Sequence, residues 1–134
     1  MNKKSLACSK ALACSGLAFA ALVAFTAAPA LAHHSFAMFD RDKPMTLEGV
    51  VRQFQWTNPH SWIQVNAPGP DGVMREWSIE GNSTGTLYRQ GWKPTSFKAG
   101  DKVSMRIFPM KDGSAGGSFV GARFADGHIL GRMD

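Results

Sequence analysis

Hydrophobic and polar residues alternate along much of the chain after residue 44. Alternation with a period of two is typical of β-strands that are buried on one face. Such runs cover residues 46–56, 60–66, 73–80, 102–110 and 118–124, so the sequence predicts five strands. Gly49 in the first run predicts a bulge or bend. Asp71-Gly72 predicts a hairpin between the second and third strands, because glycine accepts the positive φ of a tight turn.

Residues 82–90 interrupt the alternation and predict one short helix. Asn82 or Ser83 is suited to cap its start, and Gly91 is suited to end it. Three strands, a helix and two more strands fit an all-β fold, namely a small five-stranded OB-like barrel with the helix between strands three and four. A small open β-sandwich is the alternative. Most tryptophans and phenylalanines lie in or beside the strands, and packing of the core accounts for them.

The first 32 residues have the order of a secretory signal peptide. The start is basic, residues 11–28 are small or apolar, and Ala30-Leu31-Ala32 supplies the small residues of a cleavage site. We therefore expect residues 1–32 to be removed and residues 33–134 to form a single OB-like β-barrel domain in the periplasm. A retained membrane anchor is the alternative, although the apolar run barely reaches the roughly 20 residues that span a bilayer. After cleavage no membrane segment is expected.

Removal of this leader changes the composition of the mature chain. Cys8 and Cys14 leave with it, so we expect no disulfide, and neither cysteine suits a lipoprotein site. The leader also holds Lys3, Lys4 and Lys10, which leaves 12 of the 15 basic residues against 10 acidic residues. A net charge of +2 without a basic block gives no support to nucleic-acid binding.

Four short motifs carry a resemblance over nearly the whole mature chain. They are His33-His34-Ser35-Phe36-Ala37, Asn58-Pro59-His60 followed by Trp62, Gly91-Trp92, and Lys98-Ala99-Gly100-Asp101. With these motifs the sequence resembles a family of small secreted proteobacterial proteins of unknown function. The resemblance implies export and a single β-domain, and it implies no particular activity or ligand.

Three histidines suggest a metal site. Cleavage after Ala32 would make His33 the first residue, and its α-amine and ring Nδ1 could chelate one ion. A free α-amine titrates near pH 7.7–8.0 and therefore loses its proton to a metal easily. His34 could add an imidazole, and His60, next to a predicted turn, could add another. Nitrogen-only tetragonal sites favour Cu(II), so the predicted cofactor is copper. The alternative is that these histidines are simply solvated or hydrogen-bonded within a turn.

A different hypothesis is a non-enzymatic OB-like binding module for a small molecule, a glycan or a periplasmic protein partner. It would use a face formed by Trp62, Trp77, Arg75 and Tyr88, where aromatic and polar residues are interleaved. No nucleophile–base pair, phosphate loop or dinucleotide motif is present in the sequence, so we do not expect an enzyme. His128, near the chain end, is expected to be solvated.

Overall fold

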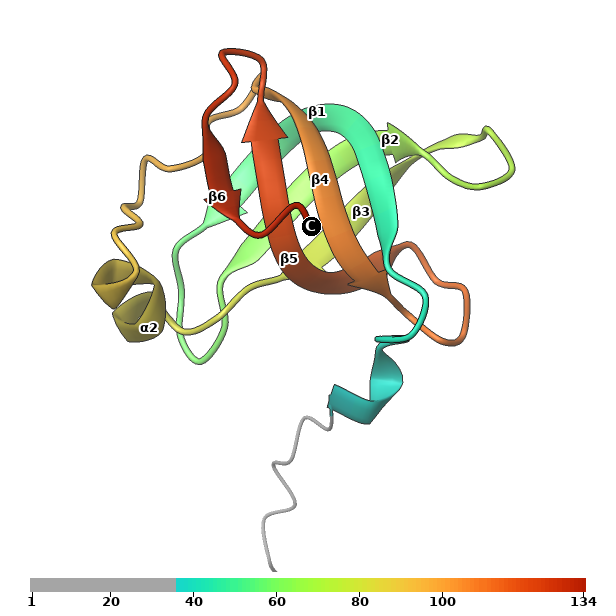
Figure 1. Ribbon diagram of the computed structural model, residues 1–134, viewed down its shortest axis with the longest axis horizontal. Coiled ribbons are helices and arrows are strands. Elements are labelled where there is room, and N and C mark those ends of the chain that lie inside the picture. Colours follow the sequence, from blue (N-terminus) through green and yellow to red (C-terminus); the bar gives the residue numbers. More distant parts are fainter. Residues whose placement is uncertain (1–35) are drawn as a thin grey trace, which may run out of the picture. The chain divides into compact units, whose positions relative to one another are not determined.

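The computed structural model of the protein describes residues 36–134. The expected signal peptide and its cleavage site lie outside these residues. Within them the chain forms six β-strands, one α-helix and one short 3-10 helix (Figure 1). In chain order these are η1 (Phe36–Met38), β1 (Met45–Gln55), β2 (Trp62–Pro68), β3 (Met74–Glu80), α2 (Thr84–Arg89), β4 (Lys102–Pro109), β5 (Gly116–Phe124) and β6 (Ile129–Gly131). No helix in this part of the chain has the length and hydrophobicity needed to span a membrane.

Five of the strands close into a barrel. Neighbouring strands follow the order β3-β2-β1-β4-β5, and β3 pairs again with β5 to complete the circle. That last pair is parallel and joins Ser78 to Gly116 and Glu80 to Ser118, whereas the other pairs in the barrel are antiparallel. The predicted OB-like barrel with one helix between strands three and four is therefore confirmed, and the open sandwich is not found.

β1 is the longest strand, and a bulge changes the face that it presents to the core. Leu47 and Val51 point inward, and the register against β2 then shifts between Val51 and Gln53. The shift makes Phe54 the next residue to pack on the core. The bulge predicted at Gly49 is therefore misplaced. Gly49 instead allows a close approach to β2, because a Cβ there would lie 2.5 Å from the carbonyl oxygen of Asn66.

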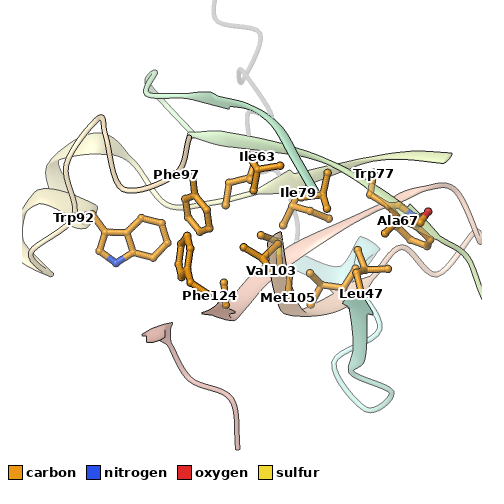
Figure 2. Packing of buried hydrophobic residues seen from close by; sticks show 14 of the residues in the cluster. Leu47, Ile63, Ala67, Trp77, Ile79, Trp92, Phe97, Val103, Met105 and Phe124 are labelled. Carbon is orange, nitrogen blue, oxygen red and sulfur yellow. Dashed lines mark hydrogen bonds between the residues drawn. The ribbon is translucent and has the colours of Figure 1, made fainter. Parts of the chain in front are cut away.

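The inward faces of the strands bury one hydrophobic core. Its aliphatic part is built from the alternating positions that the sequence predicts, including Ile63, Val65, Ile79, Met105 and Ile107. Near α2 the core is aromatic, with neighbouring ring centroids of Phe54, Trp92, Phe97, Phe119 and Phe124 separated by 5.0–6.3 Å. Figure 2 shows Trp92, Phe97 and Phe124 together in this region and Trp77 far from them, beside Ala67. This aromatic cluster anchors the segment that follows α2 to the barrel.

The C-terminal part of the chain is more ordered than the sequence indicates. β5 begins at Gly116, two residues earlier than predicted, because Gly116 and Gly117 pair with β3 and close the barrel. The tail after residue 128, where the sequence predicts no strand, forms β6 and continues along β5 through a hydrogen bond from Arg132 N to Val120 O of 2.9 Å. Glycine at 121 permits this contact, because a Cβ there would overlap the backbone of Arg132.

Candidate functional site

The loop between β1 and β2 is tied to the start of α2 by one side chain. Oδ1 of Asn58 accepts hydrogen bonds from the backbone nitrogen of Thr84 at 3.1 Å and from its hydroxyl at 2.9 Å. The Asn58–Pro59 peptide bond is cis, and His60 follows directly. On the other side of the loop, the hydroxyl of Thr57 donates to the carbonyl oxygen of His60 at 2.9 Å. The backbone position of His60 is therefore fixed both by its own loop and by the helix.

The ring of His60 is oriented by a carboxylate from β3. Its Nδ1 lies 2.8 Å from Oε1 of Glu80 and 3.3 Å from the carbonyl oxygen of Gly81. Both partners are acceptors, which assigns the proton to Nδ1. In the neutral ring the lone pair is then on Nε2, the form in which an imidazole binds a metal through that atom. The side chains are only 28% exposed for His60 and 13% exposed for Glu80, so water competes weakly for this contact.

Ser61 fixes the neighbouring ends of β2 and β3. Its hydroxyl is fully buried and donates to the carbonyl oxygen of Asn82 at 3.0 Å, and its backbone carbonyl accepts from Gly81 N at 2.8 Å. A Cβ on Gly81 would overlap the hydroxyl of Ser61, so the close contact requires glycine. Because Glu80 directly precedes Gly81, these contacts fix its position beside His60.

The His60–Glu80 pair lies in the wall of a cavity of about 500 Å³. This volume falls within the range of about 300–1,000 Å³ that is usual for small-molecule sites. The other walls come from η1, the segment around α2, β5 and the tail after β6, and include Phe36, Asn82, Leu87, Gln90, Trp92, Phe119 and Arg132. The cavity therefore combines aromatic walls with one carboxylate, one imidazole and one guanidinium group.

Only one of the three predicted metal ligands can be located. His33 and His34 lie outside the described residues, whereas His60 is the wall residue just described. Phe36, the first described residue, lines the same cavity as His60. Within residues 36–134, no group of three or more His, Cys, Asp or Glu side chains is arranged to hold a metal ion.

The four residues predicted to form a ligand-binding face are dispersed. Trp77 is 3% exposed and its indole nitrogen donates to the carbonyl oxygen of Ala67 at 3.2 Å, so it is a core residue and not part of a binding face. Trp62 is half-buried and, with Gln64 of the same strand, faces away from the buried positions of β2. Arg75 pairs with Asp71 in the β2–β3 loop, and Tyr88 is exposed on α2. These side chains do not share one surface because strand alternation and the length of β2 separate them.

Glu80 is a site residue that sequence reasoning missed. Alternation along β3 assigns it to a polar face together with Glu76, and nothing local distinguishes the two. The structure does distinguish them, since Glu76 is 54% exposed beside Arg52 whereas Glu80 is nearly buried against His60. A buried carboxylate needs a hydrogen-bonding partner, and that partner is 20 residues away in the sequence.

The other described histidine, His128, is exposed as expected but has defined partners. Its ring stacks on Phe124 with centroids 3.9 Å apart, and its Nδ1 lies 2.7 Å from Oδ1 of Asp126. Hydrogen bonds from the backbone and ring of His128 lower the pKa of the Asp126 carboxyl. His128 therefore supports a turn on another part of the surface and does not line the cavity of His60.

The fold and the site together define a small closed β-barrel with a carboxylate-oriented histidine in the wall of an aromatic cavity. The chain belongs to the family of unknown function DUF6152, whose family model matches residues 20–119. The predicted resemblance to an uncharacterised family is thus confirmed. The matched range contains both His60 and Glu80. No curated protein and no solved structure matches the chain.

Proposed function

We propose that the protein is an exported copper-binding protein that holds Cu(II) with His33, His34 and His60 after removal of residues 1–32. It would act in copper handling or delivery, or as an accessory to a redox enzyme. The observation that carries the proposal is the hydrogen bond of 2.8 Å between His60 Nδ1 and Glu80. A metal-binding histidine usually donates its second ring N–H to a carboxylate or carbonyl, which fixes the ring and raises its basicity. His60 has both partners, Glu80 and the carbonyl of Gly81.

The short chain distance between the cavity and the proposed terminus supports a shared site. Phe36 and His60 line the same cavity, and His33 precedes Phe36 by three residues. An extended chain covers about 3.3–3.6 Å per residue, so three residues allow a reach of about 10 Å. The length of chain is therefore sufficient for a terminal residue to approach the cavity wall.

The donor set explains the choice of metal. The α-amine and Nδ1 of a terminal His33 would form one chelate ring, and the Nε2 of His60 would be a third nitrogen. His34 could complete or exchange with this set through its own imidazole. Cu(II) ranks above the other first-row divalent ions for such nitrogen donors, and it accepts tetragonal geometry. Zinc sites usually also employ thiolates or a closed tetrahedral set, and the chain after residue 32 contains no cysteine.

The test is calorimetric titration of the secreted protein with Cu(II), after its mass has established which residue is first. We expect one Cu(II) per chain when His33 is the terminus, with nitrogen hyperfine structure in the electron paramagnetic resonance spectrum. His60→Ala is expected to weaken binding by about tenfold or more. One alanine added before His33 should have a similar effect, because it removes the amine from the chelate ring.

One further variant and two controls make the test specific. Glu80→Gln removes the charge behind His60 and is expected to weaken Cu(II) binding by about 10- to 100-fold. Glu76→Gln, on the same strand but 54% exposed, should leave the affinity unchanged. His128→Ala controls for adventitious binding to a surface imidazole. Affinity that is insensitive to both His60→Ala and the added residue, or a mature chain that begins elsewhere, would refute the proposal.

A further inference from the structure

We propose that the protein has a binding site for a small aromatic carboxylate in a trough that runs along the outside of β5 from His60 to Arg41. The site is formed by residues 36–134 alone, and it does not depend on copper. The ligand's carboxylate would bind Arg132 and Arg41, and its ring would pack on the phenylalanines that line the same hollow.

The trough consists of two adjoining hollows. One is the cavity of about 500 Å³ that contains His60 and Glu80, and the second has a volume of about 260 Å³ and contains Arg41 and Phe108. The two share a stretch of wall that is formed by Phe36, Asn82, Ser118, Phe119, Val120 and Arg132. A ligand lying along β5 would therefore contact both hollows.

The two arginines supply the charge that an anion requires. Arg132 lines both hollows, and the guanidinium carbon of Arg41 lies 5.5 Å from the centroid of the Phe108 ring. Among residues 36–134, neither arginine forms an ion pair with a carboxylate. The planar guanidinium group matches a carboxylate in two parallel hydrogen bonds. Among the wall residues that the structure describes, Glu80 is the only acid, and it is paired with His60 at the opposite end of the trough, so an anion is expected to bind near the arginines.

The apolar walls favour a ligand with an aromatic ring over a simple inorganic anion. Phe36 is 61% exposed, and Phe108 and Phe119 are only half-buried, although all three line the trough. Burial of this apolar surface under a ligand is favourable, and a ligand with an aromatic ring can pack edge-to-face on the phenylalanine rings. Inorganic phosphate or sulfate would engage the arginines but would leave these rings in contact with water.

Segments from both ends of the described range, residues 36–134, contribute to the trough, and backbone hydrogen bonds hold each of them. Asp40 N donates to Pro109 O at 2.8 Å and Lys111 N donates to Met38 O at 2.9 Å, which hold the segment between Phe36 and Arg41. At the other end, the bond from Arg132 N to Val120 O fixes the tail on β5. Both arginines therefore lie on backbone segments that are held to the barrel by hydrogen bonds.

The experiment uses 3-phenylpropanoate as the probe, with 3-phenylpropanamide as its neutral analogue and propanoate as the analogue without a ring. The secreted protein is kept in chelator, and amide chemical shifts are followed by NMR during titration. We expect saturable shifts at Phe119, Val120 and Arg132, with a Kd on the order of 1 mM for this small probe. Each analogue should bind at least about tenfold more weakly than 3-phenylpropanoate.

Variants locate the binding. Arg132→Gln and Phe36→Ala alter exposed side chains and should each weaken binding of 3-phenylpropanoate, by about tenfold for the arginine. Arg123→Gln changes an exposed arginine of β5 that lies outside the trough, so this variant is the matched control and should bind as the parent does. Absence of saturable shifts, equal binding of the amide, or an unchanged Kd in Arg132→Gln would each overturn the proposal. Because metal is withheld, none of these results depends on the copper proposal.

Discussion

Replacement of Trp77 by phenylalanine tests whether this residue belongs to the core or to a ligand-binding surface. Trp77 is 3% exposed, and its indole N–H donates to the carbonyl oxygen of Ala67 at 3.2 Å. Trp62, on the neighbouring strand, is half-buried and faces outward. The two residues have the same type and lie on one hairpin, so Trp62→Phe is a matched control.

The expected loss of stability in Trp77→Phe has two sources. The change to phenylalanine removes the buried hydrogen bond from the indole to the carbonyl oxygen of Ala67, and one such bond contributes about 0.5–1.5 kcal/mol. The smaller ring also leaves space in the core, which adds about 1 kcal/mol. We therefore expect Trp77→Phe to lower the free energy of unfolding by about 1.5–2.5 kcal/mol. For Trp62→Phe we expect a loss below about 1 kcal/mol.

Urea unfolding followed by far-UV circular dichroism measures both values, and it avoids the change in fluorescence that loss of a tryptophan causes. The midpoint for Trp77→Phe should fall by on the order of 1 M relative to the parent. Equal losses for the two variants would contradict the assignment of Trp77 to the core, as would a larger loss for Trp62→Phe.

Two further predictions concern the closure of the barrel and the β2–β3 loop. Gly117→Ala should destabilise the fold by about 1–3 kcal/mol, because its Cβ would lie 2.7 Å from the carbonyl oxygen of Phe108. Gly85→Ala in α2, where the nearest atom is 3.7 Å away, should instead stabilise the fold by up to about 1 kcal/mol in the same urea experiment. The hydrogen bond from Arg75 lowers the pKa of Asp71 below its usual value of 3.8, so an NMR titration should find that carboxyl still ionised at a pH where a free aspartate is protonated. Any stabilisation from this contact is complete above the usual pKa and is lost as the pH falls through the lowered pKa. Arg75→Gln should raise the pKa of Asp71, and no change would show that another group causes the shift.

Sequence patterns were most informative where the structure depends on neighbouring residues. The positions that alternate in β2 and β4 are the positions that are buried, for example Ile63 and Val65 in one and Met105 in the other. Helix signals were also accurate, because Ser83 accepts a hydrogen bond from Thr86 N and Gly91 has a positive φ of 85°. Capping and turn geometry involve residues only a few positions apart, so local chemistry is sufficient to predict them.

The alternating pattern did not predict two features that depend on a strand far away in the sequence, namely a bulge and an additional strand pair. In β1 the bulge between Val51 and Gln53 places Phe54 against the core instead of Gln53. The alternation of hydrophobic and polar residues alone does not reveal such a shift in register. Likewise β6 depends on Gly121, which makes room for the backbone of Arg132. The two apolar residues Ile129 and Leu130 are too short a run to predict this pairing from the sequence.

The candidate site was predicted in part. His60 was selected from its turn, but its orientation depends on Glu80, and the exposed face expected for Trp77 does not exist. The predicted partners His33 and His34 lie outside the described residues, so the copper site remains a proposal that the titrations above would decide.

By itself the sequence determined the five strands of the barrel, which face of most of them is apolar, and where the chain turns. These features follow from a period of two and from the conformational preferences of single residues, and each involves only a short segment. Only the tertiary structure decided that Glu80 meets His60 and that Phe36, Arg41 and Arg132 meet along β5. Such contacts depend on the register of the strands and on closure of the barrel, which join residues that are far apart in the chain.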